Sequence, residues 1–266
     1  VGDSAFTASS GFSSMISIFS IFSDTYSIGC FFSIVVGAQL KNDTNINNIN
    51  IILNKFIMNS GFYLVSTPIG NLEDITIRAI NILKNSDLIL CENTSNSKKF
   101  LDKYEIKTSL SKYTDHDFHN KKNYILKLLN DNKIISLISD SGSPLISDPG
   151  NQLINFLFTN QMRVFSIPGA SSIVSGIQLS GFLNKKKFTF IGFLPKKKEQ
   201  KEKILLENNI SNLIIFSTKL QLKKDINSIA TISKTFEVVI LKELTKIYEE
   251  RIFMNNKNYK DFNYSK

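Results

Sequence analysis

The sequence is poor in cysteine and histidine, which argues against two common kinds of stabilising site. It holds two Cys and two His in 266 residues, and no Trp. Cys30 and Cys91 lie far apart and have no metal-binding spacing. They therefore indicate a reducing compartment, here the cytoplasm, rather than a disulfide framework. So few Cys and His side chains also argue against a zinc site, and we expect no metal.

The sequence also lacks an uninterrupted apolar run of about 20 residues, the length that spans a bilayer. Two apolar patches, 16–22 and 28–40, are separated by the polar stretch 23–27, and no basic residue precedes Lys41. A signal peptide needs such a positive start. We therefore expect no membrane partner, and we interpret Met58 as the natural start, with 1–57 as a non-native upstream or disordered segment. A membrane or export role is the alternative.

Acidic residues are in deficit over most of the chain. The net charge is +9, and residues 58–266 carry 30 basic against 20 acidic side chains. A basic excess on one globular unit indicates a polyanionic partner such as nucleic acid. The alternative is an AT-rich genome, because the sequence is also rich in Lys, Asn and Ile.

From residue 61 the pattern alternates between short apolar strands and amphipathic helices, which is typical of a parallel α/β sheet. We predict an N-terminal α/β domain over 58–170 and a C-terminal α/β domain over 171–266. Predicted strands are 62–66, 88–91, 134–138, 163–167, 188–193, 213–216, 237–241 and 246–253. Predicted helices are 74–83, 95–104, 124–129, 152–158, 173–179, 201–206 and 222–229.

Three loops rich in Gly and Pro follow three predicted strands. They are Thr67–Leu72, Ser139–Gly150 and Pro168–Ser172. Open α/β sheets bind ligands at the carboxyl ends of their strands, so these loops predict a crevice for a small polar cofactor held by main-chain hydrogen bonds. None of them is a P-loop or a G-x-G-x-x-G motif, and none contains an activated nucleophile.

Two lysine triplets, Lys185–Lys187 and Lys196–Lys198, flank the aromatic strand predicted at 188–193. The lysines are candidates for contacts with RNA phosphates, and solvated flanks of a core strand are the alternative. We expect the Phe side chains of this strand to be buried. His116 and His119 could form a catalytic dyad, but in a polar loop such histidines are more often only solvated.

Several of these motifs resemble the tetrapyrrole methylase superfamily, in particular its members that methylate ribosomal RNA. The resemblance runs from about Met58 to Glu250 in order and with normal spacing. Its motifs are Phe62-Tyr63-Leu64-Val65-Ser66-Thr67-Pro68-Ile69-Gly70-Asn71-Leu72-Glu73-Asp74-Ile75-Thr76, Cys91-Glu92-Asn93-Thr94, Ser139 to Gly150, Pro168-Gly169-Ala170-Ser171, Gly192-Phe193-Leu194-Pro195 and Lys242-Glu243-Leu244-Thr245-Lys246.

The resemblance implies two α/β domains with S-adenosylmethionine bound in the cleft between them, and a homodimer. It implies methylation of the ribose 2′-hydroxyl of a cytidine in the decoding region of 16S ribosomal RNA, within the small (30S) subunit. We expect the cofactor to be held by Pro68, Ile69, Gly70, Ser139, Asp140, Ser141, Gly142, Ser143, Pro168, Gly169, Ala170 and Ser171. For the catalytic proton transfer the candidates are Glu243 and Lys246, although an ordinary surface ion pair is an equal alternative.

The sequence departs from the family pattern at two places. Asn93-Thr94-Ser95 stands where the family has Asp-Thr-Arg. The run Phe216-Ser217-Thr218-Lys219-Leu220-Gln221 stands where the family has Tyr-Glu-Ser-Pro-His-Arg, so the acid, the Pro and the Arg are lost. We also expect the C-terminal domain to be truncated before the family's last strands. Two other functions therefore stay open, methylation of a tetrapyrrole and RNA binding without catalysis.

Overall fold

The structure is a computed structural model that describes residues 15–21, 31–37, 58–182, 187–208 and 211–264, with only the backbone for the first two ranges. The chain divides into two compact units, Val1–Met58 and Asn59–Lys266. In the first unit, β1 (Met15–Ile21) pairs antiparallel with β2 (Phe31–Gly37), with Met15 opposite Gly37. These strands fall within the two apolar patches of the sequence.

The second unit is built on a five-stranded sheet with the order β5-β4-β6-β3-β7. Every neighbouring pair in it is parallel, which confirms the predicted sheet. The short edge strand β5 has little apolar periodicity, so the sequence pattern does not predict it. The strands are β3 (Gly61–Val65), β4 (Leu88–Cys91), β5 (Leu110–Lys112), β6 (Ile134–Ile138) and β7 (Val164–Ile167).

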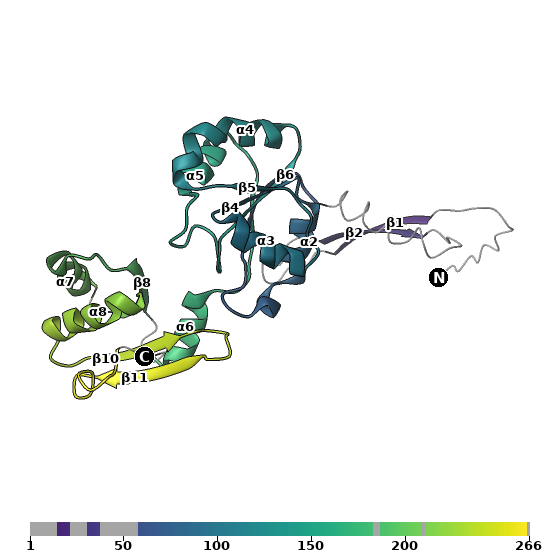
Figure 1. Cartoon of the computed structure of the whole chain (residues 1–266). Coiled ribbons are helices and arrows are strands. Elements are labelled where there is room, and N and C mark those ends of the chain that lie inside the picture. The colour runs from purple at the N-terminus through teal and green to yellow at the C-terminus, as the bar shows by residue number, and fades with distance from the viewer. Residues whose placement is uncertain (1–14, 22–30, 38–57, 183–186, 209–210, 265–266) are drawn as a thin grey trace, which may run out of the picture. The chain divides into compact units, whose positions relative to one another are not determined.

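Helices cover both faces of this sheet, with α2 and α3 on one side and α4 and α5 on the other (Figure 1). The helices are α2 (Ile77–Asn85), α3 (Thr94–Lys103), α4 (Phe118–Asn130) and α5 (Asn151–Thr159), and the 3-10 turns are η1 (Leu72–Asp74) and η2 (Asp115–Asp117). Side-chain caps fix where two of the helices begin. Thr76 caps α2, and Asn93 caps α3 by accepting from the backbone N–H groups of Ser95 and Asn96.

The core lies between the sheet and the helices α4 and α5. Phe62, Ile135 and Leu153 are completely buried in one apolar cluster with Leu90 and Leu157. The strands show little alternation of apolar and polar residues, because both faces of a parallel sheet are covered. In β6, for example, all five residues are buried. This core fixes the ends of the central strands, from which the candidate site is built.

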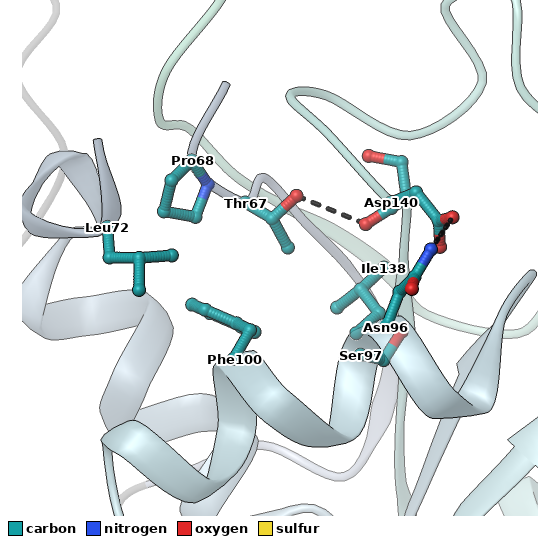
Figure 2. A pocket seen from close by; sticks show the side chains of 9 residues that line it. Thr67, Pro68, Leu72, Asn96, Ser97, Phe100, Ile138 and Asp140 are labelled. Atoms are coloured by element: carbon teal, nitrogen blue, oxygen red, sulfur yellow. Dashed lines mark hydrogen bonds between the residues drawn. The ribbon is translucent and has the colours of Figure 1, made fainter. Parts of the chain in front are cut away.

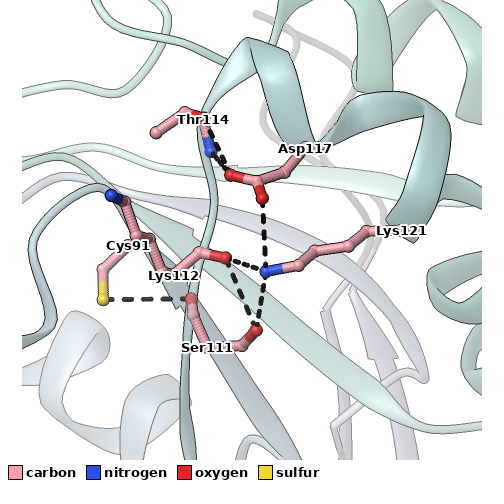
Figure 3. A network of polar contacts seen from close by, with 6 residues as sticks. All are labelled: Cys91, Ser111, Lys112, Thr114, Asp117 and Lys121. Atoms are coloured by element: carbon pink, nitrogen blue, oxygen red, sulfur yellow. Dashed lines mark hydrogen bonds and ion pairs between the residues drawn. The ribbon is translucent and has the colours of Figure 1, made fainter.

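Helix α4 begins six residues before the predicted start at Tyr124, so His119 lies in a helix and His116 in η2, not in a loop. A polar network explains the earlier start (Figure 3). The backbone N–H and the hydroxyl of Thr114 both donate to Asp117 Oδ2 at 2.8 Å. Lys121, one turn further on, donates to the carbonyl of Lys112 and to Ser111 Oγ, 3.3 Å away. These contacts fasten the start of the helix to β5.

The rest of the second unit contains two small sheets. β8 pairs parallel with β9, and β10 pairs antiparallel with β11. The elements are α6 (Ser172–Ser180), β8 (Phe188–Phe193), α7 (Lys198–Glu207), β9 (Asn212–Phe216), α8 (Lys219–Ile232), β10 (Glu237–Lys242) and β11 (Glu250–Asn255).

The strand predicted at 246–253 is displaced, because residues 243–249 form a turn and β11 begins at Glu250. Glu243 and Thr245 have positive φ angles of 54° and 65°, a conformation that does not fit a strand. Within the described part of the chain, no helix is both long and apolar enough to cross a bilayer.

Candidate functional site

The loops after β3, β6 and β7 lie at one edge of the sheet because these strands are neighbours in the order β6-β3-β7. The first two loops are joined by an isolated β-bridge between Thr67 and Gly142. The N–H of Thr67 donates to the Gly142 carbonyl at 2.9 Å, and the N–H of Gly142 donates back to the Thr67 carbonyl at 3.1 Å. The Thr67 hydroxyl also donates to the Ser139 carbonyl at 3.1 Å.

The third loop meets the other two at two close approaches. A Cβ added at Gly142 would lie 3.2 Å from Ile69 Cγ2 and 3.8 Å from the Ala170 carbonyl oxygen. A Cβ at Gly169 would lie 2.9 Å from Ser66 Cβ. Gly142 also has a φ of +83°, which favours glycine. The structure therefore brings the three loops that the sequence singled out to one place.

A first cavity opens between these loops and helix α3 (Figure 2). Asn96 Nδ2 donates to Asp140 Oδ2 at 3.3 Å and so links the helix to the loop after β6. The lining residues from α3 were not among the predicted site residues, because helical spacing alone gives them no chemical signal. The cavity is lined by Thr67, Pro68, Leu72, Asn96, Ser97, Phe100, Ile138, Ser139 and Asp140.

A second cavity of about 250 Å³ lies on the other side of Gly142. Its wall combines polar residues of two loops with two aromatic rings, Phe193 at the end of β8 and Phe216 at the end of β9. Their ring centroids are 5.5 Å apart in an edge-to-face arrangement. The cavity is lined by Ser141, Gly142, Ser143, Ile146, Ser147, Asp148, Ser171, Ser172, Ile173, Phe193 and Phe216.

The predicted cofactor residues are thus divided between the cavities. Pro68, Ser139 and Asp140 line the first, and Ser141, Gly142, Ser143 and Ser171 line the second. The other five belong to the same loops but line neither cavity: Ile69, Gly70, Pro168, Gly169 and Ala170. Ser171 also caps α6, because its hydroxyl accepts from Val174 N at 3.5 Å.

Glu243 and Lys246 form an exposed ion pair with a separation of 3.0 Å. Their turn packs against the first loop: Asn71 N donates to Thr245 Oγ1 at 2.9 Å, and a Cβ at Gly70 would lie 2.7 Å from Lys246 Cγ. The turn is therefore next to the candidate site, although neither charged residue lines either of the two cavities described above.

The lysines that flank β8 are exposed where they are described, namely at Lys187, Lys196, Lys197 and Lys198. Lys185 and Lys186 lie outside the described residues. The prediction that the Phe side chains of β8 are buried is wrong at both ends of the strand, because Phe188 is 54% and Phe193 58% exposed. Phe193 instead lines the second cavity, beside the ring of Phe216.

The loop between β6 and α5 is held in a strained path. Leu145 and Ser147 have φ angles of 70° and 69°, which cost non-glycine residues about 1–3 kcal/mol each. At the end of the loop, Gly150 N donates to Asp115 Oδ1 at 2.9 Å. Asp148 lies between these points and lines the second cavity. Burial, with a smaller contribution from Glu92 and Asp140, raises the pKa of Asp148 to about 6.

Position 217, where the resemblance led us to expect an acid, carries Ser217, and the structure supplies a carboxylate from elsewhere. Ser217 Oγ donates to Asp225 Oδ2 at 2.6 Å, and Asp225 Oδ1 is paired with the buried ammonium of Lys201. Asp225 comes from α8, one turn after Gln221. The residue that follows Phe216 at the end of β9 is therefore hydrogen-bonded to a carboxylate, although it is not itself acidic.

The second cavity has the groups that the implied cofactor, S-adenosylmethionine, requires. Hydroxyl and backbone groups of Ser141, Ser143 and Ser171 supply hydrogen bonds, and the two Phe rings supply an apolar surface for an adenine. Gly142 lines the cavity and has no side chain, so its backbone can approach a ligand closely. These residues fit the cofactor.

The sequence is similar to those of known proteins. A family model described as "Tetrapyrrole (Corrin/Porphyrin) Methylases" matches residues 61–257. The chain is 46% identical over 199 residues to "Ribosomal RNA small subunit methyltransferase I" of Rickettsia prowazekii, covering 73% of this chain and 70% of the relative. It is 40% identical over 190 residues to the protein of the same name from Halalkalibacterium halodurans, covering 71% of this chain and 65% of the relative.

Among solved structures, the chain is similar to uroporphyrin-III C-methyl transferase from Thermus thermophilus complexed with S-adenyl homocysteine. The TM-score is 0.53 at 14% sequence identity, covering 76% of this chain and 90% of the other. At 14% sequence identity, this structural similarity is evidence for the fold alone, and it confirms the predicted α/β class. The chain spans 65–70% of the length of the two sequence relatives.

Proposed function

We propose that this chain, which belongs to the tetrapyrrole (corrin/porphyrin) methylase family, transfers a methyl group from S-adenosylmethionine to the RNA of the small ribosomal subunit. The observation that carries the proposal is the meeting of three strand-end loops at Gly142, beside a cavity of about 250 Å³. The names of the relatives support ribosomal RNA as the substrate. The sequence resemblance refines the acceptor to the ribose 2′-hydroxyl of a cytidine in the decoding region.

S-Adenosylmethionine supplies, when bound, an electrophilic methyl group on a sulfonium. The residues of this chain have to bind the donor, align the acceptor hydroxyl with it and accept one proton. Main-chain and hydroxyl groups of Ser141–Ser143 and Ser171 hold the donor. The exposed lysines of the β8 flanks bind RNA phosphates, which is consistent with the excess of 30 basic over 20 acidic residues in 58–266.

The proposal includes an organisation of the whole protein. The sheet of β3 to β7 forms the N-terminal domain (58–170), and the elements from α6 to β11 form the C-terminal domain (171–266). The enzyme works in the cytoplasm, where ribosomal RNA is found, and as a homodimer. Residues 1–57 are dispensable for donor binding, a proposal that the boundary of the two compact units at Met58 supports.

A methylation assay tests the proposal. Small subunits that lack the ribose modification are incubated with the protein and the donor, and the RNA is digested and analysed by mass spectrometry. The expected result is one additional methyl group on one cytidine ribose. Transfer to uroporphyrinogen but not to the subunit would favour the tetrapyrrole alternative. RNA binding with no calorimetric heat from the donor would favour a protein that binds RNA without catalysis.

A further inference from the structure

Asp148 is the one carboxylate among the residues that line the second cavity. It shares the cavity with Ser141, Gly142 and Ser143, which precede it in the same loop, and with Phe193 and Phe216, which come from the two strands of another sheet. The hypothetical Cβ of Gly192 lies 3.6 Å from Ser147 Oγ, so the end of β8 packs beside the residue before Asp148. A ligand bound between these loops and the two Phe rings would therefore lie near the Asp148 carboxylate.

The Asp148 carboxylate is available as an acceptor and is held in place by its backbone. No side chain or N–H in the described part of the chain donates a hydrogen bond to it, whereas Asp115 accepts one and Asp117 accepts two. The backbone is fixed on both sides of it, at Ser147 by a left-handed conformation and two residues further on, at Gly150, by the hydrogen bond to Asp115. A rigid backbone with an unused acceptor in a cavity suits a group that receives a proton from a ligand.

We propose that the carboxylate of Asp148 is the proton acceptor for the hydroxyl group that is methylated. This role rests on the proposed function. In the step, the hydroxyl oxygen forms a bond to the methyl carbon, and the bond between that carbon and sulfur breaks with its electron pair going to sulfur. The O–H proton passes to a carboxylate oxygen of Asp148, directly or through one water, and is later released to solvent.

The electrostatic surroundings of Asp148 agree with the role. Burial is the main cause that raises its pKa to about 6, and the carboxylates of Glu92, after β4, and of Asp140, in the same loop, raise it further. The walls from β8, β9 and α6 contribute uncharged residues, Phe193, Phe216 and Ser171–Ile173. An acid with a pKa just below the working pH is ionised and still basic enough to accept a proton efficiently.

Replacing the carboxylate without changing its size is the first test. Asp148→Asn should lower kcat for methyl transfer to the small subunit by about 100-fold or more, the range of a general base. The dissociation constants of S-adenosylmethionine, by calorimetry, and of the RNA, by fluorescence anisotropy, should stay within about threefold. Asp131→Asn, at the exposed C-terminal end of α4, is the matched control for loss of one negative charge and should retain wild-type rates.

The pH dependence gives a second test. The acid limb of kcat/KM should titrate near pH 6 in the wild type, and Glu92→Gln should shift it to lower pH by removing a neighbouring negative charge. A raised pKa also means that the ionised carboxylate destabilises the folded state above pH 6, and that this cost disappears towards pH 4. Asp148→Asn should therefore raise Tm at pH 8, and its advantage should shrink as the pH falls to 4.

The outcomes separate the two proposals. A wild-type chain that binds no donor and transfers no methyl group would overturn the proposed function and this role with it. An active wild type with an equally active Asp148→Asn, or with loss of activity in Glu243→Gln instead, would overturn the role of Asp148 alone. Loss of donor affinity in Asp148→Asn to the same extent as loss of rate would also overturn it, because the carboxylate would then bind the cationic donor.

Discussion

The sheet of β3 to β7 and the two small sheets of β8 to β11 are stabilised by different means. The first is built around completely buried apolar side chains such as Phe62, Ile135 and Leu153. In the described part of 188–264, by contrast, the buried apolar residues are Leu205, Ile226 and Met254, and a buried ion pair joins Lys201 of α7 to Asp225 of α8. Helices cover both faces of the larger sheet (Figure 1), as its parallel strands require.

This difference has a consequence for the site. The loops that hold the proposed donor extend from the well-covered sheet, so their geometry is fixed by a large apolar core. The aromatic wall of the second cavity comes from β8 and β9, whose position depends on few apolar contacts and on a polar network. We infer that stability changes in the small sheets affect the aromatic wall first, and that changes in the large core affect the loops.

The largest effect on stability is expected for the buried ion pair between Lys201 and Asp225. Asp225→Ala should lower the free energy of unfolding by about 3–5 kcal/mol, because it leaves the Lys201 ammonium buried without its partner. Urea denaturation followed by circular dichroism measures the change. The control is the double variant Lys201→Met with Asp225→Leu, which should be neutral or stabilising. A single variant as stable as wild type would mean that the pair is not buried in solution.

A substitution in the core between the large sheet and helix α5 should have a slightly smaller effect. Leu153→Ala should destabilise by about 2–5 kcal/mol, because it opens a cavity in the cluster that contains Phe62 and Ile135. The exposed Phe158 of the same helix is the control, and Phe158→Ala should cost much less. Equal costs for the two variants, measured in the same urea titrations, would contradict the view that this region is stabilised by its interior.

Gly142→Val should disturb the site more than the fold. The backbone at Gly142 has a φ of +83°, and a side chain would press against Ile69, so we expect a loss of about 1–3 kcal/mol. Calorimetry should show no donor binding, because Gly142 lines the second cavity and the strained backbone there would change the shape of the loop. Gly176→Ala, in α6 and with 3.6 Å to Leu241 Cδ1, is the control and should bind normally. Normal affinity in a folded Gly142→Val protein would remove this loop from the site.

Much of the larger sheet could be predicted from the sequence, because the spacing of apolar residues and the Gly/Pro loops are local signals. Strand β6 was predicted with its observed bounds, and the three loops of the candidate site were found from their composition. What could not be predicted depends on contacts between distant residues. The exposure of Phe193, the pairing of Ser217 with Asp225, and the place of Asn96 in a cavity wall all depend on how separate elements meet.

The smallest effect on stability is expected for the lysines that follow β8. Their replacement should instead have a specific effect on RNA binding. Replacing Lys196, Lys197 and Lys198 by Ser should weaken RNA binding and lower the log–log salt slope by up to about 2, or about 0.7 for each lost contact on a single strand. All three are exposed, and Lys198 pairs with Glu202 at 3.7 Å, so their removal should hardly change stability. Donor affinity should stay the same, since none of them lines either of the two cavities of the candidate site.

The matched control replaces three other exposed lysines, Lys84, Lys107 and Lys127, which lie on or beside the helices of the larger sheet. It removes the same net charge, so a general charge effect would lower RNA affinity equally in both proteins. A specific RNA surface beside β8 predicts a lower salt slope for the Lys196–Lys198 variant alone. If both salt slopes equal that of the wild type, the lysines beside β8 are merely solvated. RNA binding at this surface then does not explain the basic composition of the chain.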